Sequence, residues 1–210
     1  MSSRRFRMSH SSKVDLFLAD TLATVSFTGG LIIFLISIST SSWVVLDGGA
    51  YIGVWNLCLV VKGSDEMDCS SYHNNPDFAR ASQGFFVVAL VCQLACLITL
   101  ICYTAISHAN KIITVICLCL IAFSAGCLTL MGTIVMAVKG KDYLYAMKTH
   151  NYRTINNFPS LTNVDLTGQL TVGWSLALAI VSGCFTLIGF GIWFTEYQVL
   201  KTAEENNNTR

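Results

Sequence analysis

Long apolar stretches alternate with short polar ones along the chain. Four stretches contain no Asp, Glu, Lys or Arg: Thr21 to Leu46, Ala81 to Asn110, Ile112 to Val138 and Leu166 to Thr195. Each exceeds the roughly 20 residues that an α-helix needs to cross about 30 Å of hydrocarbon. The pattern predicts four membrane-spanning helices, at about 21–42, 81–107, 112–138 and 169–194, in a single domain covering residues 1–210.

The polar segments predict the topology. Four spans put the tails 1–20 and 195–210 on one side and the loops 43–80 and 139–168 on the other. Basic residues beside a first helix tend to stay in the cytosol, and this tail carries Arg4, Arg5, Arg7 and Lys13. We therefore expect both termini to be cytosolic. A cleaved signal peptide is the alternative, but the apolar run from Leu16 to Ser41 is longer than the usual 7 to 15 residues.

The second and third spans are separated only by the short polar stretch from His108 to Lys111. A connection of this length predicts that the two helices form an antiparallel hairpin with a tight cytosolic turn.

The first outer loop has the pattern of a small antiparallel sheet. Asp47-Gly48-Gly49 and Lys62 to Glu66 are turn signals, and Tyr51 to Val61 is rich in the β-branched and aromatic residues typical of strands. Cys58 and Cys69 flank the second turn, so they can face each other across a hairpin. A disulfide there would stabilise the loop by roughly 3 kcal/mol and would place it outside the cytosol. Two unrelated thiols are the alternative.

Composition narrows the class of function. Hydrophobic residues make up 53% and charged residues 12% of the chain, against about a quarter charged in soluble domains. The net charge of +1 gives no reason to expect a nucleic-acid partner. Phosphate-binding glycine loops, HExxH and GxSxG are absent from the sequence, and we expect no pair of ionisable residues within the spans. These features predict a protein of the lipid bilayer that is not an enzyme and has no cofactor or metal.

Other residues are candidates for contacts. The second outer loop carries the aromatic residues Tyr143, Tyr145, Tyr152 and Phe158, which suit either a protein interface or the headgroup layer. Seven cysteines lie within the spans, and we interpret most as small buried hydrophobes. Cys102 and Cys117, near the cytosolic ends, are candidates for palmitoylation. Ala122-x-x-x-Gly126 and Ala179-x-x-x-Gly183 have the spacing that lets helices pack closely in lipid, within one bundle or between molecules.

One array of residues resembles the signature of a known superfamily. Its members in this chain are Trp43, Gly53-Val54-Trp55, Cys58, Cys69, Arg80 within Ala79-Arg80-Ala81, and Gly173-Trp174. The array resembles the claudin and peripheral myelin protein superfamily, which also includes the epithelial membrane proteins and channel gamma subunits. The resemblance implies an all-α membrane protein, a left-handed four-helix bundle topped by a small extracellular β-sheet, with a Cys58–Cys69 disulfide. It also implies that Trp43 and Trp55 anchor the sheet near the outer leaflet, where indoles suit the headgroups, and that Arg80 and Trp174 open the second and fourth helices.

Two functions follow from the resemblance. The first is a plasma-membrane protein that organises cell contacts or junctions, binding the same or related proteins within one membrane and across to the next. The alternative is an auxiliary subunit that binds a channel or receptor within the membrane. Only nine residues separate Trp43 from Gly53, so the arm that lines paracellular pores in claudins is shortened here.

Overall fold

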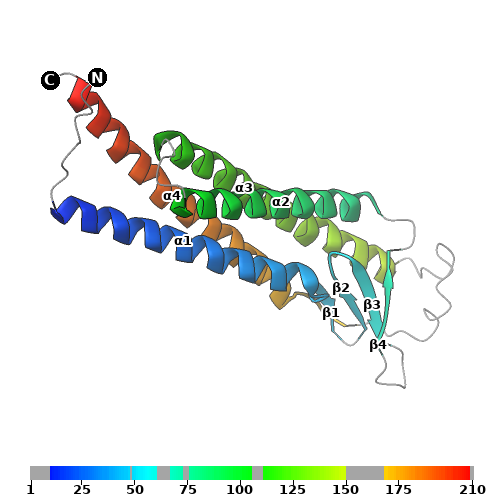
Figure 1. Ribbon diagram of the computed structural model, residues 1–210. Helices are drawn as coiled ribbons and strands as arrows, with labels where there is room; N and C mark the ends of the chain where they lie inside the picture. Colours follow the sequence, from blue (N-terminus) through cyan, green and yellow to red (C-terminus); the bar gives the residue numbers. More distant parts are fainter. Residues whose placement is uncertain are drawn as a thin grey trace.

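Four long helices and a small sheet at one end of them make up the fold (Figure 1). The computed structural model describes residues 10–47, 49–60, 67–72, 76–105, 111–149 and 168–208. The helices are α1 His10–Ser39, α2 Asp77–Ala105, α3 Lys111–Thr149 and α4 Trp174–Asn208. Each contains a stretch long and apolar enough to cross a membrane. The predicted class, a four-helix membrane protein with a small antiparallel sheet, is confirmed.

The helices pack in the order α1, α4, α3, α2. Helix α4 lies along both α1 and α3, and α2 lies along α3, whereas α1 and α2 barely touch. The side-by-side packing of α2 and α3 agrees with the predicted helical hairpin, although the turn itself lies outside the described residues. The first residue of α1 and the last of α4 lie at the same end of the bundle, opposite the sheet (Figure 1). We call these the terminal end and the sheet end.

Small residues hold α4 against its neighbours. A Cβ atom built on Gly126 of α3 would lie 3.6 Å from the carbonyl oxygen of Gly183 in α4. On the other side, the Ser182 hydroxyl donates a hydrogen bond of 2.8 Å to the carbonyl oxygen of Gly30 in α1. The small-residue spacings found in the sequence therefore serve packing inside this bundle, because the glycines at their ends face a helix of the same chain.

The core of the bundle consists of two apolar clusters. One lies at the sheet end and includes Phe34, Phe86 and Met136, and the other lies at the terminal end and includes Phe27 and Trp193. Buried polar residues occupy the helix segments between the clusters: Gln93, Thr129, Thr133, Ser182 and Thr186. The three threonine hydroxyls donate to carbonyl oxygens four residues earlier in their own helices. Their hydrogen-bonding capacity is thereby satisfied without water, as hydrocarbon requires.

Five antiparallel strands form the sheet: β1 Val44–Leu46, β2 Ala50–Ile52, β3 Asn56–Val60, β4 Met67–Ser71 and β5 Leu170–Val172. Their order is β4-β3-β2-β1-β5. The stretch from Tyr51 to Val61 is not continuous, because Gly53-Val54-Trp55 turns the chain between β2 and β3. Strand β5 comes from the second loop and pairs with β1, with Val172 opposite Val44. The sheet thus joins the two polar loops, which sequence analysis treated separately.

The helices do not have the bounds of the predicted spans: α1 begins at His10 rather than at about 21, and α2 runs from Asp77 to Ala105. Helix α3 does not end at residue 138 but continues to Thr149, because Leu144 is buried in the core beside the sheet and extends the apolar face of the helix. Helix α4 begins at Trp174 rather than at 169, because the preceding residues pair as β5, and it continues to Asn208.

Two acidic residues lie in the helices at the terminal end of the bundle. Glu196 is only 4% exposed in α4, and the Asp20 carboxylate of α1 accepts a hydrogen bond of 3.4 Å from Trp193 Nε1. Both acidic residues belong to helical stretches apolar enough to cross a membrane. The spans expected from the sequence begin at 21 and end at 194, so both residues fall just outside them.

We predict that Gly173→Ala destabilises the fold by about 1–3 kcal/mol, the usual cost of forcing extra atoms into a packed core. A Cβ atom at Gly173 would lie 1.8 Å from the backbone oxygen of Ser42, so the junction between β5 and α4 would have to open. Gly191→Ala is the matched control, because nothing lies within 4 Å of the added Cβ. Thermal stability in detergent, followed by size-exclusion chromatography, measures the effect. Equal melting temperatures for the two variants would contradict the prediction.

Candidate functional site

One face of the sheet is buried against the helices. Side chains alternate along the strands, and those on this face are fully buried: Val44, Leu46, Ala50, Ile52, Leu57 and Leu59. They share a cluster with Phe86 of α2 and with Met136 and Leu144 of α3. Because α3 extends beyond residue 138, it provides the platform on which the strands pack. The sheet is therefore fixed to the bundle rather than carried on flexible linkers.

Trp43 joins the helices to the sheet from inside the protein. Its side chain is 0% exposed, its Nε1 donates a 3.0 Å hydrogen bond to the carbonyl oxygen of Ser37, and its ring lies 5.0 Å from that of Phe86. The expected position facing the lipid headgroups is therefore wrong for Trp43. The indole turns inward because the backbone on either side of it is paired, its N–H with Ile52 and its carbonyl oxygen with Gly173.

The turn Gly53-Val54-Trp55 joins the sheet to the first two helices. Trp55 Nε1 donates to the carbonyl oxygen of Ile38 in α1 at 2.9 Å, and Gln83 Nε2 of α2 donates to that of Val54 at 3.0 Å. A Cβ atom at Gly53 would lie 2.8 Å from the Cα atom of Ser41, which explains the glycine. The Trp55 ring is 40% exposed, so this tryptophan has the half-buried position that an interfacial anchor needs.

Tyr72 also contacts the turn Gly53-Val54-Trp55. Its hydroxyl donates a 2.5 Å hydrogen bond to the carbonyl oxygen of Gly53. Burial, and to a lesser degree the neighbouring Tyr143, raises the pKa of Tyr72 far above its ordinary value. The hydroxyl is therefore neutral at every physiological pH and acts only as a hydrogen-bond donor here.

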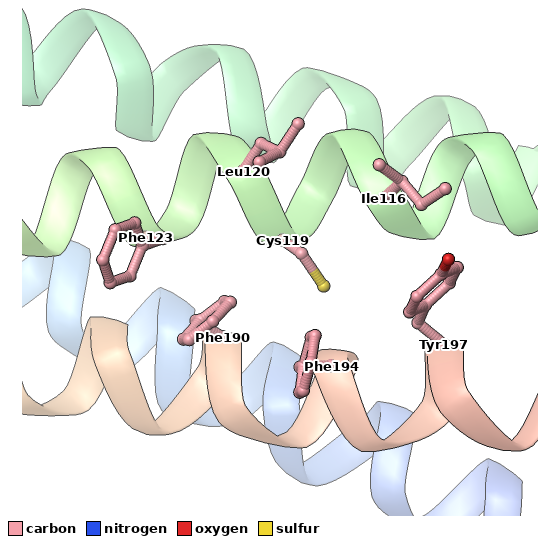
Figure 2. A pocket seen from close by; sticks show the side chains of 7 residues that line it. All are labelled: Ile116, Cys119, Leu120, Phe123, Phe190, Phe194 and Tyr197. Atoms are coloured by element: carbon pink, nitrogen blue, oxygen red, sulfur yellow. The ribbon is translucent and has the colours of Figure 1, made fainter.

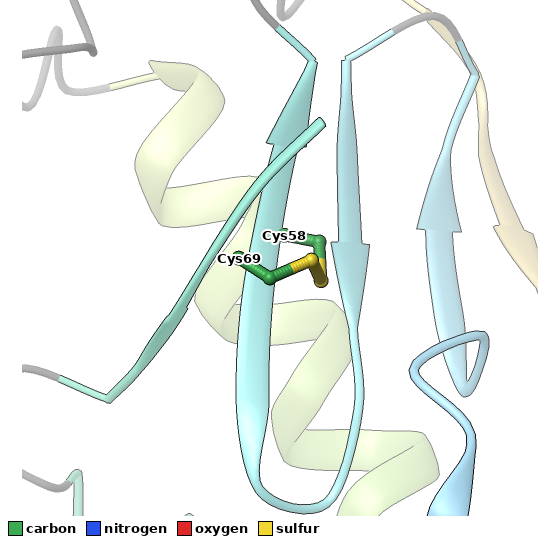
Figure 3. The surroundings of a disulfide bond; sticks show 2 residues. All are labelled: Cys58 and Cys69. Atoms are coloured by element: carbon green, nitrogen blue, oxygen red, sulfur yellow. A yellow bond between two sulfur atoms is a disulfide. The ribbon is translucent and has the colours of Figure 1, made fainter. Parts of the chain in front are cut away.

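The predicted disulfide between Cys58 and Cys69 is confirmed (Figure 3). The two cysteines are directly opposite each other in β3 and β4, with their Cα atoms 4.0 Å apart. They lie on the face of the sheet away from the helices, because Leu57 and Leu59 on either side of Cys58 point into the core. The bond joins the last strand of the sheet to its neighbour.

Strand β4 has a free edge in the part of the chain that the structure describes. Hydrogen bonds from Gly53 N to Asn56 O and from Val60 N to Gly49 O show that alternate residues of β3 direct their backbone groups toward β2. Leu57 and Leu59 must then pair with β4, through Ser70 and Asp68. The backbone groups of the alternate residues, Met67, Cys69 and Ser71, therefore point away from the sheet.

The remaining candidates do not gather in one place. Arg80 is exposed in the first turn of α2, and Trp174 is exposed at the start of α4. Tyr143 and Tyr145 lie on α3 rather than in a loop. Tyr145 is exposed, whereas the Tyr143 ring packs 5.4 Å from that of Phe78. Only Tyr145 therefore has the exposure expected of a contact residue, and Tyr152 and Phe158 lie outside the described residues.

The cysteines outside the disulfide are all free thiols. Cys96 and Cys119 are buried as expected, whereas Cys102, Cys117 and Cys184 are exposed on the helices. The two candidates for palmitoylation are thus accessible. Among the described residues, no group of three or more His, Cys, Asp or Glu side chains is arranged to hold a metal ion.

Sequence reasoning missed Tyr72, Gln83 and strand β5. The two side chains act through single hydrogen bonds to distant backbone atoms, which leave no periodic signal. Strand β5 had a weak signal, because Leu170-Thr171-Val172 contains two β-branched residues directly before a glycine.

The chain was compared with known protein families and with characterised proteins. No family model matches it, and no characterised protein matches it significantly.

We predict that Cys58→Ser and Cys69→Ser each destabilise the protein by roughly 2–5 kcal/mol, the usual cost of losing a native disulfide from a small unit. The double variant should be no less stable than either single one, because all three lack the same bond. Cys184→Ser, which changes an exposed free thiol, should leave the melting temperature unchanged. Stability in detergent without reductant measures this, and an additive loss in the double variant would argue against a bond between the two.

Proposed function

We propose that the protein is a non-enzymatic member of the claudin and peripheral myelin protein superfamily that organises cell–cell contacts at the plasma membrane. In this proposal the helices form a left-handed bundle, both termini are cytosolic, and the sheet faces the extracellular space. Its partners are copies of itself or related proteins, in the same membrane and in the next. Trp43, Gly53, Trp55, Cys58, Cys69, Arg80 and Trp174 carry the resemblance.

The free edge of β4 is the observation that carries this function. A strand edge with unpaired N–H and C=O groups is a template for pairing with another chain. Here the edge is exposed along most of its length, and the disulfide holds it to β3. Because the sheet is seated on α3, a contact made at this edge would be transmitted directly to the membrane helices.

The proposed orientation of the protein in the membrane rests on two chemical arguments. Disulfides persist outside the cytosol, which favours an extracellular sheet. The basic residues Arg4, Arg5, Arg7 and Lys13 precede α1, and such residues favour the cytosolic side. Both arguments give the same topology, because the sheet and the two terminal helix ends are at opposite ends of the bundle.

We predict that an epitope at the N-terminus is detected by antibody only after the cells are permeabilised. A membrane-impermeant maleimide should label Cys58 and Cys69 on intact cells only after reduction by an impermeant reductant, in a variant whose seven free cysteines are replaced by serine. Detection of the N-terminal epitope on intact cells would refute the proposed topology.

We predict that replacing Met67 and Ser71 together by proline abolishes enrichment of the protein at contacts between expressing cells. Proline removes the outward N–H at each position and leaves the hydrogen bonds to β3 in place. The double alanine variant is the matched control, because it loses the same side chains and keeps both N–H groups. The assay mixes two differently labelled cell populations and compares contacts between two expressing cells with contacts to a non-expressing cell.

Surface biotinylation shows whether the proline variant reaches the plasma membrane in normal amounts. Equal contact enrichment of the proline and alanine variants would remove the strand edge from the mechanism. If the wild type shows no enrichment and instead co-purifies with a channel or receptor in mass spectrometry, the protein is an auxiliary subunit and the cell-contact function is wrong.

A further inference from the structure

An apolar groove of about 290 Å³ opens between α3 and α4 in the terminal half of the bundle (Figure 2). Three residues of each helix form its walls: Ile116, Leu120 and Phe123, and Phe190, Phe194 and Tyr197. Cys119 lies between them, with its sulfur pointing into the groove. All of these residues belong to the stretches of α3 and α4 that are long and apolar enough to cross a membrane. The groove therefore opens toward hydrocarbon.

The side chains that line the groove leave it open. Its aromatic rings support one another, with centroids 5.2 Å apart for Phe123 and Phe190, 5.9 Å for Phe190 and Phe194, and 6.3 Å for Phe194 and Tyr197. Leu120 at the rim is 63% exposed. An empty apolar space would forfeit the dispersion contacts of all its walls, so it is filled by whatever hydrocarbon surrounds the helices.

A helix from another protein fits the groove poorly. Close helix contacts in lipid need small residues at the contact, and all the residues that line this groove except Cys119 have large side chains. A flexible acyl chain does not need small residues at the contact.

The charges beyond the groove indicate which lipid it belongs to. The groove ends at the Tyr197 side chain, whose hydroxyl points toward Ile116 (Figure 2). Lys201 follows one turn later on α4 and is exposed, and its ammonium lies 3.9 Å from the Glu205 carboxylate. Glu204 and Glu205 follow one further turn out and are also exposed. Along α4, from the groove outward, apolar side chains are thus followed by a hydroxyl group, then by a positive charge and then by negative charges.

That order complements a zwitterionic phospholipid, in which a phosphate follows the acyl chains and an ammonium group follows the phosphate. Helix α3 begins at Lys111, just beyond Ile116, so the positive end of its dipole also lies on the phosphate side. We propose that the groove binds one acyl chain of a zwitterionic phospholipid, with the phosphate near Tyr197 and Lys201 and the amine near Glu204 and Glu205. The binding does not depend on the cell-contact function.

The test is native mass spectrometry of the full-length protein, released from vesicles that contain equal amounts of phosphatidylethanolamine and phosphatidylglycerol. The wild type should retain one phosphatidylethanolamine. Leu120→Trp places an indole in the groove and should lose that lipid. Ile134→Trp is the matched control on α3, because Ile134 is equally exposed, at 62%, but does not line the groove, and it should keep the lipid.

A second pair of variants tests the headgroup. Glu204→Lys with Glu205→Lys should shift retention from phosphatidylethanolamine to phosphatidylglycerol, whereas Glu204→Gln with Glu205→Gln should only weaken the preference. Equal retention by Leu120→Trp and Ile134→Trp would overturn the proposal. So would a wild type that retains both lipids alike, or an acyl group that survives denaturation, is released by hydroxylamine and maps to Cys119, because the groove would then hold a covalent thioester.

Discussion

The backbone junction at Ser42 and Trp43 connects the first helix, the fourth helix and the sheet. Trp43 N donates to Ile52 O in β2 at 2.9 Å, Gly173 N donates to Trp43 O at 2.9 Å, and Ser175 N donates to Ser42 O at 3.2 Å. The end of α1, the start of α4 and the sheet therefore meet at two residues. Such contact is feasible only where no side chain intervenes, which is why a glycine precedes α4. Through this junction, the two helices hold the sheet in a fixed position.

Membrane proteins must satisfy polar groups internally, and this bundle does so mostly through short-range bonds. Threonine hydroxyls donate to carbonyl oxygens of their own helices. Ser37 Oγ instead donates to the carbonyl oxygen of Ser175 at 2.7 Å and links α1 to α4. Gln93 is an exception, because neither atom of its buried carboxamide has a hydrogen-bond partner. A buried amide in hydrocarbon costs free energy that an alanine would not, so the centre of the bundle is not optimised for stability alone.

Sequence reasoning predicted the features that are visible within one stretch of the chain, and it missed contacts between distant segments. Four apolar stretches specified four helices, and two cysteines flanking a turn specified the hairpin of β3 and β4. The addition of β5 could not be derived, because three residues in the second loop carry no sign of their pairing with β1. The inward position of Trp43 was missed for the same reason, because it depends on contacts that the local sequence does not show. An indole after an apolar stretch is typical of a membrane interface, and only the tertiary contacts with Ser37 and Phe86 reverse that expectation.

The two surfaces that we assign lie at opposite ends of the molecule, and the core between them is not continuous. Buried polar residues separate the apolar cluster under the sheet from the cluster at the terminal end. Helix α3 nevertheless runs through both, carrying the sheet on Leu144 and the groove on Leu120. Coupling between lipid binding and sheet contacts would therefore pass along α3, because this helix takes part in both surfaces. At the level of Thr129 and Thr133, Gly126 and Gly183 also hold α3 closely against α4, so a displacement of α3 would move α4 with it.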